Sequence, residues 1–357
     1  MVCMSPFGIV ENCLPAVSVV IPCRNERDGI EACLQSLLKQ ESPPGGFEII
    51  VADGMSDDGT RDILTNLSDE ISNVHMVDNP RLITPCGMNA GIAMARGRYI
   101  AIMGAHNRYA PDYLVQALQV LEFNQADNVG GTMLCEGESW VQRAIAIAHH
   151  SPFSVGGARW HRLQYEGPAD TVFGGVYRRT VFEKIGFFDE DLIRNQDDEF
   201  NLRLKKAGGT IWQSPRIKSW YRPRGSLLAL FRQYQQYGYW KVRVIQKHRL
   251  PASIRHLVPG GFLLFLGFLL TLAPWSALAM WGFLGTLSIY ALFTVGASLV
   301  CAARSEWRFF PILPIVFACY HFGYGIGFLG GIWDFVIRRK GPHTTYTQLT
   351  RTSKPSS

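Results

Sequence analysis

Three carboxylates stand side by side in the stretch Asn195–Arg203, which reads NQDDEFNLR. Asp197, Asp198 and Glu199 are followed by no further Asp or Glu until Glu306. Like charges held this close repel each other, so the cluster calls for a nearby cation, hydroxyl proton or phosphate-bound metal. The structural alternative is a solvated helix start, because acidic residues also favour the first turn of a helix. The cluster is therefore either a chemical site or an ordinary helix terminus.

The charged residues divide the chain into an acidic, a basic and an apolar part. Residues 1–199 carry 27 Asp and Glu against 15 Lys and Arg, a net charge of −12 (15 − 27), although the whole chain carries +6. Residues 200–256 carry 13 Lys and Arg and no acid, and an apolar tract, Leu257 to Val336, follows. Basic residues beside an apolar span mark the cytoplasmic side of a membrane and attract anionic lipids. We therefore expect a cytoplasmic head on a multi-pass segment of the plasma (inner) membrane, with lipid rather than nucleic acid as the partner of the basic collar.

Three segments of the apolar tract are candidates for crossing a membrane. Gly260–Leu272 and Ala277–Cys301 are separated by a turn that contains proline, and Phe309–Val336 forms the third segment. A span needs about 20 apolar residues, so we expect about three transmembrane helices. Three spans would put the basic residues 338–340 on the far side, against the positive-inside tendency, unless the third segment lies partly in the interface. The polar residues 341–357 are expected to be disordered.

The head begins with alternating strand-like and helix-like segments. Continuous apolar runs, typical of buried parallel strands, occupy residues 16–21, 47–52 and 99–103. Helical patterns occupy residues 27–39, 61–67 and 89–96. This order predicts an α/β fold with a doubly wound, mostly parallel sheet whose ligands bind at the carboxyl ends of the strands. The polar candidates at those ends are Asn25, Glu26, Asp53 and residues 104–107.

Five motifs, taken in order, resemble those of the inverting family 2 glycosyltransferases with a GT-A fold. They are Val19–Glu26 (VVIPCRNE), Val51–Thr60 (VADGMSDDGT), Asn89–Gly97 (NAGIAMARG), Gln196–Asp197 and Gln236–Trp240 (QYGYW). The last is similar to the Q-x-x-R-W motif of the membrane-bound processive members, with Tyr239 in place of Arg. The sequences Gly104-Ala105-His106 and NQDDEF at 195–200 are most similar to the succinoglycan-biosynthesis type. The resemblance covers residues 16–256 motif by motif.

The resemblance implies a membrane-bound inverting hexosyltransferase that moves a sugar from a nucleotide diphosphate donor, with a UDP-sugar favoured, to a lipid-linked or polysaccharide acceptor. Such an enzyme would serve exopolysaccharide or cell-surface glycan synthesis, alone or in a polysaccharide synthesis complex. Two alternatives are a catalytically weak sugar-nucleotide-binding subunit and a nonenzymatic membrane scaffold. The expected domains are an N-terminal extension (1–15), a GT-A catalytic domain (16–215), a basic interfacial collar (216–256), a transmembrane region (257–336) and a polar tail (337–357).

On this resemblance, Asp53 at the end of the second strand accepts the N–H of a pyrimidine base, and Pro22 and Glu26 line the same pocket. A turn-forming aspartate is the structural alternative for Asp53. The full expected donor site comprises Pro22, Arg24, Asn25, Glu26, Asp53, Gly54, Asn89, Gly104 and Ala105. Helix capping rather than ligand binding is expected of Asp57, Asp58 and Thr60.

His106 is the candidate metal ligand. It ends the sequence Gly104-Ala105-His106, at the position where the family has a D-x-D motif that holds the Mn²⁺ or Mg²⁺ bridging the diphosphate. Mn²⁺ is favoured here, because imidazole is a poor ligand for Mg²⁺, which prefers oxygen. The alternative is a histidine that forms hydrogen bonds at the end of a strand. If a metal is held weakly, Arg222 and Arg224 of the collar could neutralise the leaving diphosphate.

An inverting transfer requires a base that takes the proton of the acceptor hydroxyl, and Asp197 is the expected base. Repulsion from Asp198 and Glu199 would raise its proton affinity, and Asp198 is the alternative base.

The acceptor end of the site is expected further along the chain. Contact with the acceptor is predicted for Gln236, Tyr239 and Trp240. The aromatic residues of this segment also fit an amphipathic helix at the level of the lipid headgroups, and both descriptions can hold together. Gly174 and Gly175 have two possible roles. They either let the backbone approach the acceptor closely or form a simple turn.

Overall fold

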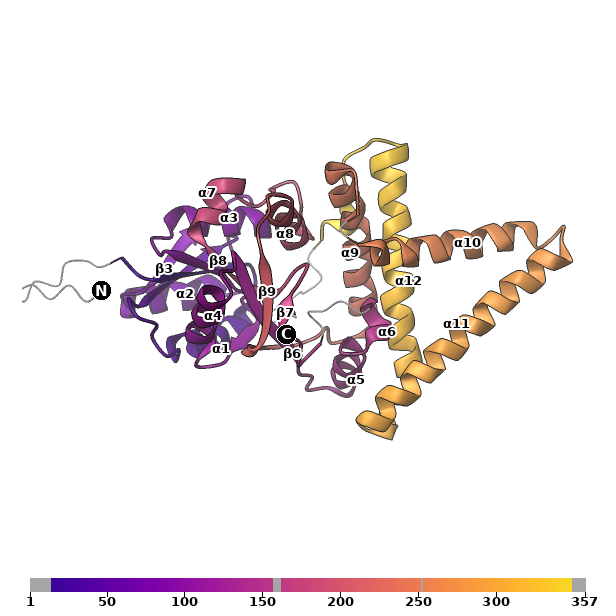
Figure 1. Ribbon diagram of the computed structural model, residues 1–357, viewed down its shortest axis with the longest axis horizontal. Helices are drawn as coiled ribbons and strands as arrows, with labels where there is room; N and C mark the ends of the chain where they lie inside the picture. Colours follow the sequence, from indigo (N-terminus) through magenta and orange to yellow (C-terminus); the bar gives the residue numbers. More distant parts are fainter. Residues whose placement is uncertain (1–13, 157–161, 252, 349–357) are drawn as a thin grey trace, which may run out of the picture. The chain divides into compact units, whose positions relative to one another are not determined.

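The computed structural model describes residues 14–156, 162–251 and 253–348 (Figure 1). The chain divides into two compact units whose segments alternate along the sequence. The first unit is built from Met1–Thr132, Glu166–Phe188 and Arg203–Ser219, and the second from Met133–Tyr165, Asp189–Leu202 and Trp220–Ser357. Residues 16–215, expected to form the catalytic domain, therefore contribute to both units.

A mixed sheet forms the centre of the first unit, with the strand order β3-β2-β1-β4-β8-β6-β9-β5 and with β7 paired to β9. Its parallel part comprises β1 (Val17–Cys23), β2 (Phe47–Asp53), β3 (Val74–Asp78) and β4 (Tyr99–Ile102). Its other strands are β5 (Asn107–Tyr109), β6 (Asn128–Cys135), β7 (Gly167–Pro168), β8 (Phe173–Arg178) and β9 (Ile211–Tyr221). β8 runs antiparallel to β4 and to β6, and β7 runs antiparallel to β9. The α/β fold with a parallel β1–β4 core is confirmed, and the sheet beyond β4 is mixed.

The helices follow the strands as the apolar spacing indicates. Those of the first unit are α1 (Arg27–Leu38), α2 (Thr60–Glu70), α3 (Thr84–Met94), α4 (Tyr113–Phe123) and α7 (Arg179–Ile185). In α1, Ile30, Leu34 and Leu37 are fully buried and belong to the same apolar core as the strands. The helix expected at 89–96 starts earlier, because Pro85 at its first turn is compatible with a helix start.

An ion pair between the buried Glu48 and the largely exposed Arg96 supports the amino ends of β1 and β2. Ser18 Oγ donates to Glu48 Oε1 at 2.6 Å, and Nε and Nη2 of Arg96 donate to Glu48 Oε2 at 2.9 and 2.7 Å. A Cβ at Gly97 would lie 2.6 Å from the Ser18 nitrogen, so this position admits only glycine without a shift of backbone. The Arg96-Gly97 part of the third motif therefore has a structural role.

We expect Glu48→Gln to lower the unfolding temperature at neutral pH and to matter less in acid. Burial raises the pKa of Glu48, but the hydrogen bonds from Ser18 and Arg96 outweigh it, and the net pKa lies below the ordinary value. The stabilisation is thus present above the unfolded-state pKa of about 4.3 and is lost as the pH falls through the lower folded-state pKa. The expected cost is about 1–3 kcal/mol at pH 7. Thermal unfolding at pH 7 and pH 4 measures it, with the exposed Glu31→Gln as control, and an equal effect at both pH values would contradict it.

The second unit is mainly helical. Its helices are α5 (Trp140–His149), α6 (Pro152–Val155), α9 (Leu227–His248), α10 (Val258–Leu272), α11 (Ala277–Arg304) and α12 (Leu313–Gly331), which continues as a π-helix over Ile332–Ile337. Short 3₁₀ turns occupy Ile254–His256, Trp307–Phe309 and Thr344–Tyr346. Helix α8 (Gln196–Lys206) begins in this unit and ends in the first.

Glycines let α9 and α12 lie side by side at backbone distance (Figure 1). A Cβ at Gly327 would lie 1.9 Å from the carbonyl oxygen of Gln235, and one at Gly238 would lie 2.0 Å from that of Tyr324. Gly323 and Gly331, one turn to either side of Gly327, approach α9 backbone in the same way. Such small-residue spacing lets two helices pack closely where side chains could not fit between them.

Two of the apolar helices, Ala277–Arg304 and Leu313–Ile337, are long and apolar enough to cross a membrane by length and composition. The expected first span, Gly260–Leu272, lies in α10, whose 15 residues fall short of the roughly 20 that a span needs. Many large apolar side chains of α10 and α11 face outward, among them Phe268 (60% exposed) and Leu292 (71% exposed). The candidate spans are therefore two among the described residues, not three.

Candidate active site

The loops after β1 and β2 are tied together by hydrogen bonds. Nδ2 of Asn25 donates to Oδ1 of Asp57 at 2.9 Å, and the Asp57 N–H donates to Oδ1 of Asn25 at 3.1 Å. The Asn25 N–H donates to Ser56 Oγ at 2.9 Å, and the Glu26 N–H donates to Thr60 Oγ1 at 3.0 Å. Asn25 has a φ of 53°, in the left-handed region that Asn enters more readily than most residues. Its backbone thereby brings the residues after β1 against the end of β2.

Asp58 prepares the start of α2. Its Oδ1 accepts the N–H of Thr60 at 3.0 Å and the Thr60 hydroxyl at 2.5 Å, and its Oδ2 accepts the Arg27 N–H at 3.2 Å. Desolvation raises the pKa of Asp58, but these hydrogen bonds outweigh it and hold the pKa below its ordinary value. The N-cap position of α2 is Gly59, so none of the three expected residues is the N-cap, although Asp58 does accept the first N–H of the helix. Thr60 is the first helical residue, and the side chain of Asp57 holds Asn25 in the neighbouring loop.

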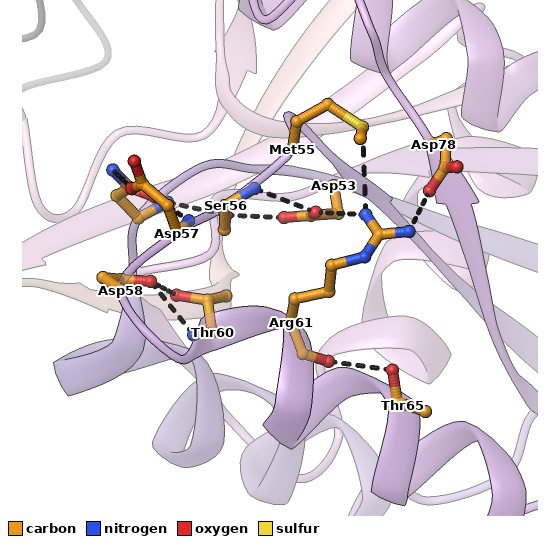
Figure 2. Close-up of polar contacts among 10 residues, drawn as sticks. Asp53, Met55, Ser56, Asp57, Asp58, Thr60, Arg61, Thr65 and Asp78 are labelled. Atoms are coloured by element: carbon orange, nitrogen blue, oxygen red, sulfur yellow. Dashed lines mark hydrogen bonds and ion pairs between the residues drawn. The ribbon is translucent and has the colours of Figure 1, made fainter.

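Asp53, the expected base-binding residue, ends β2 and is fully buried. Figure 2 shows Arg61 between Asp53 and Asp78, with N–O distances of 2.8 and 2.6 Å. Asp53 also accepts the Ser56 hydroxyl at 2.6 Å and the Ser56 N–H at 3.1 Å, which is the turn-forming role named as its alternative. A carboxylate has about four acceptor positions, and three are filled here, so one remains for the N–H of a base. Base binding by Asp53 stays a prediction.

The other expected donor residues divide into two groups. Pro22 lies in β1, and Arg24 packs over Gly54, where an added Cβ would lie 3.1 Å from Arg24 Cβ. These residues share the carboxyl ends of β1 and β2 with Asp53. Asn89 instead clamps the backbone of Phe188, because its Nδ2 donates to the Phe188 carbonyl at 2.9 Å and its Oδ1 accepts the Phe188 N–H at 3.0 Å. This structural role was not expected.

The sequence Gly104-Ala105-His106 follows β4. The Gly104 N–H donates to the Tyr109 hydroxyl at 2.8 Å, and Ala105 is buried. His106 Nδ1 lies 3.2 Å from Glu26 Oε1, and both side chains are partly exposed. The segment therefore presents one imidazole beside one carboxylate at the carboxyl ends of β1 and β4.

The His106–Glu26 pair fits a divalent cation that takes its remaining ligands from a substrate. Two ligands bound at about 2.1 Å and about 90° apart are separated by roughly 3.0 Å, close to the observed 3.2 Å. Among the described residues, no group of three or more His, Cys, Asp or Glu side chains could hold a metal alone. One nitrogen and one oxygen donor suit Mn²⁺ better than Mg²⁺. The same distance also satisfies the alternative, a histidine engaged in a hydrogen bond.

Gly174 and Gly175 are explained by packing inside the first unit. Gly174 has a φ of 61°, and an added Cβ would lie 2.4 Å from the Tyr113 hydroxyl. A Cβ at Gly175 would lie 2.8 Å from both Asn128 Oδ1 and the Tyr177 ring. These contacts favour the turn interpretation, and an acceptor role for the two glycines stays a prediction.

The three carboxylates of α8 have different surroundings in the second unit. Glu199 is fully buried, and its Oε1 lies 2.8 Å from Lys247 Nζ and 3.0 Å from His248 Nε2. Asp198 is 29% exposed and its Oδ2 pairs with Lys241 Nζ. Asp197 is exposed, and no described residue forms an ion pair with it. The three acids lie in the first turn of the helix, as the structural alternative requires, yet only Asp197 is left for an external partner.

The proton affinity of Asp197 is raised, but desolvation contributes more than the expected repulsion from Asp198, and Glu199 is not among the causes. Desolvation by the surrounding protein and repulsion from Asp198 raise the pKa of Asp197 to about 6, although the side chain keeps contact with solvent. Asp198 differs, because Lys241 overcomes its desolvation and holds the pKa of Asp198 below its ordinary value. A carboxyl group with a pKa near 6 can both accept and release a proton near neutral pH.

The basic candidates of the collar also differ from each other. Arg222 pairs with Glu138 at 2.6 Å in an exposed ion pair. Arg224 is partly buried and acts on Arg194, whose pKa is lowered by desolvation and by this second positive charge. Arg194 Nε donates to Gln236 Oε1 at 3.0 Å and Nη1 to the Ile193 carbonyl at 3.3 Å, both uncharged acceptors. The two guanidinium groups therefore act on each other as like charges.

The expected acceptor residues on α9 are covered by the C-terminal segment in the second unit. Tyr239 and Trp240 are fully buried, the ring of Tyr346 stacks on Tyr239 with centroids 3.9 Å apart, and Trp240 Nε1 donates to the Tyr346 carbonyl at 3.0 Å. Gln236 Nε2 donates to the carbonyl of Gln348 at 2.7 Å. The expectation of disorder is wrong for residues 341–348, and residues 349–357 lie outside the described residues. The acceptor role of these side chains stays a prediction.

The comparisons with known proteins agree with the fold and identify the family of the chain. The family described as Glycosyl transferase family 2 matches residues 18–186. The chain is 30% identical over 321 residues to the succinoglycan biosynthesis protein ExoA of Rhizobium meliloti (strain 1021), covering 89% of this chain and 95% of that protein. The chain belongs to glycosyltransferase family 2. It is a glycosyltransferase related to enzymes of exopolysaccharide and glycan biosynthesis.

Two further relatives extend the comparison across the chain. A Methanococcus voltae protein named as a dolichyl N-acetyl-alpha-D-glucosaminyl phosphate 3-beta-D-2,3-diacetamido-2,3-dideoxy-beta-D-glucuronosyltransferase is 27% identical, covering 88% of this chain and 97% of that protein. The mannosyltransferase PcManGT from Pyrobaculum calidifontis, solved with GDP-Man and Mn²⁺, is 19% identical with a TM-score of 0.59, covering 90% of this chain and 88% of that one. The latter similarity shows the GT-A fold alone.

Proposed function

We propose that this glycosyltransferase is a membrane-bound inverting enzyme that moves a sugar from a nucleotide diphosphate, a UDP-sugar in the first instance, to a lipid-linked or polysaccharide acceptor. The observation that carries the proposal is the separation of the α8 carboxylates: Asp197 is exposed, forms no ion pair with any residue that the structure describes, and has a raised pKa. A base of an inverting transfer needs this combination of access and proton affinity.

The chemical step follows from that assignment. The acceptor oxygen attacks the anomeric carbon from the side opposite the diphosphate, and a new C–O bond forms as the bond to the diphosphate oxygen breaks. Asp197 takes the hydroxyl proton, while the bonding electrons leave with the nucleoside diphosphate. Base assistance of this kind contributes about 10²–10⁴ in rate.

The diphosphate of the donor and the phosphate of a lipid-linked acceptor both carry negative charge that the protein must compensate. A cation held by His106 and Glu26 would supply positive charge to a bound diphosphate. Arg194 and Arg224 supply a second positive site, in the unit that contains Asp197. Guanidinium groups bind phosphate oxygens in well-defined geometry, so this pair suits the phosphate of a donor or of a lipid-linked acceptor.

Two observations support the proposed acceptor and location. The name of the Methanococcus relative describes an acceptor sugar on dolichyl phosphate, which supports a lipid-linked acceptor here. The exposed apolar side chains of α10 and α11 support insertion in a bilayer, because such surface is unfavourable in water. We place the chain at the plasma (inner) membrane with the first unit in the cytoplasm, where nucleotide sugars are available, serving polysaccharide synthesis alone or in a complex.

A panel of radiolabelled nucleotide sugars, incubated with membranes that contain the full chain, tests the proposal. We expect one UDP-sugar to label an organic-extractable lipid or a polymer, and Mn²⁺ to increase the labelling more than Mg²⁺. Stabilisation of the chain by UDP against heat without any transfer would indicate a sugar-nucleotide-binding subunit instead. The absence of both transfer and stabilisation would indicate a scaffold.

A further inference from the structure

Lys241 is a buried cation on α9. Its side chain is 5% exposed, and its Nζ forms a short ion pair with Oδ2 of Asp198. Lysine is rarely buried unless a charge compensates it, so the position of this ammonium group is fixed by the carboxylate that it contacts. Asp198 adjoins Asp197 in the first turn of α8.

The other charges near this pair lie on the side of Asp198. Arg255 and His256, in the 3₁₀ turn Ile254–His256, lower the pKa of Asp198 together with Lys241, whereas the burial of Asp198 acts in the opposite direction. Tyr324 of α12 interacts electrostatically with both Asp198 and Arg255. Asp197 is influenced by the charges of Asp198 and of Lys241. Positive charge is therefore concentrated on one member of the carboxylate pair.

Two adjacent carboxylates titrate as a pair, and a symmetrical pair would share its proton between them. A cation bound to one member breaks the symmetry, because it stabilises the ionised form of that member and leaves the proton to the other. The neighbouring Glu199 has its own partners, because its Oε1 lies 2.8 Å from Lys247 Nζ and 3.0 Å from His248 Nε2.

We propose that Lys241 is a positioning residue that keeps Asp198 ionised and so makes Asp197 the carboxylate that exchanges protons. The proposal rests on the proposed function, because it explains how a run of three acids yields one base. It also assigns a role to the residue that directly follows the Gln236–Trp240 motif.

Carbodiimide labelling of the purified full chain tests the proton distribution without any sugar substrate. Carbodiimide activates protonated carboxyls, which glycine ethyl ester then traps, and fragment spectra separate Asp197 from Asp198. Any amide formed between Asp198 and Lys241 is counted as reaction at Asp198. At pH 5.5 we expect about tenfold more labelling at Asp197 than at Asp198 in the native chain, as for a pKa difference of about one unit or more. In Lys241→Met this ratio should fall several-fold towards one, with the remaining preference due to Arg255 and His256, and in Lys241→Arg it should stay near the native value.

The pH profile of transfer supplies the second measurement, with the donor that the membrane assay identifies. Loss of a cation next to a carboxylate pair raises its proton affinity by about one pKa unit, so Lys241→Met should lose about tenfold in kcat/KM at pH 5.5 and less than about twofold at pH 8. Lys247→Met is the matched control, because Lys247 lies on the same helix and contacts Glu199 and Asp189 of the same unit. The fall of kcat/KM on the acidic side of the pH profile should occur at the same pH in Lys247→Met as in the native chain.

Three outcomes decide the proposal. An unchanged labelling ratio in Lys241→Met overturns it, and so does an equal loss of kcat/KM at every pH, which indicates a merely structural lysine. If the ratio changes as expected while Asp197→Asn still transfers sugar, the control of the proton by Lys241 stands and the catalytic assignment of Asp197 falls.

Discussion

Replacing Asp197 by asparagine is expected to lower the rate of sugar transfer by about 10²–10⁴, the usual contribution of a general base. The change removes the only α8 carboxylate that no described residue pairs with, and it keeps the size of the side chain while replacing one acceptor oxygen by an NH₂ donor. The native rate should fall about tenfold per pH unit below the pKa of about 6, because the base must be ionised to accept a proton. Transfer from the radiolabelled donor, measured between pH 5 and pH 8, checks both statements.

Donor binding is the control for this variant. UDP should raise the unfolding temperature of Asp197→Asn as much as that of the native chain, because the side chain acts on the acceptor. Asp191→Asn removes another exposed acid of the same unit and should leave transfer unchanged. Unchanged transfer in Asp197→Asn would remove the base assignment, and loss of the UDP effect would show that Asp197 serves the donor.

The parallel core and its loop ends could be predicted because their signals are local. β1 and β2 are continuous apolar runs, and Asp58 accepts the first N–H of α2 from Thr60, two residues later, so a short window of sequence contains the whole interaction. β3 was missed because only Val74 of its five residues is fully buried, so no apolar run marks it. The same half-buried pattern occurs in loops and exposed helices.

The roles that escaped prediction depend on partners far away in the sequence. The amide of Asn89 serves Phe188, 99 residues later, and Trp240 bonds to Tyr346, 106 residues later. Lys241 was assigned only to the basic collar, since nothing in its own segment shows that its charge is matched by Asp198. Residue type identified the acidic cluster, and the resemblance to the family singled out Asp197, but its difference from Asp198 and Glu199 comes from the cations that the fold places beside those two residues.

Replacing Arg61 by methionine is expected to destabilise the first unit by about 3 kcal/mol, the order of cost for leaving a buried charge without its partner. Asp53 has no exposed surface, and Arg61 is the cation that contacts it at 2.8 Å. Because methionine keeps most of the aliphatic part of the side chain, the loss of stability measures mainly the removal of the positive charge of Arg61. Because 1 kcal/mol corresponds to about 2–4 °C for a domain of this size, the unfolding temperature should fall by roughly 6–12 °C. Thermal unfolding of the purified chain measures this shift.

Asp78→Asn separates the contribution of the Arg61–Asp78 ion pair from that of the Arg61–Asp53 ion pair. It breaks the contact of Arg61 with a carboxylate that is 56% exposed, and such surface pairs contribute only about 0–1 kcal/mol. The difference between the two variants therefore reports what burial adds to the Asp53 pair. Equal small shifts would mean that water reaches Asp53 once Arg61 is gone, and the acceptor position that we assign to a base would then be open to solvent. A large fall in the unfolding temperature of Arg61→Met alone would mean that water does not reach the Asp53 carboxylate. A carboxylate that is kept from water and fixed in orientation is suited to accept the N–H of a base.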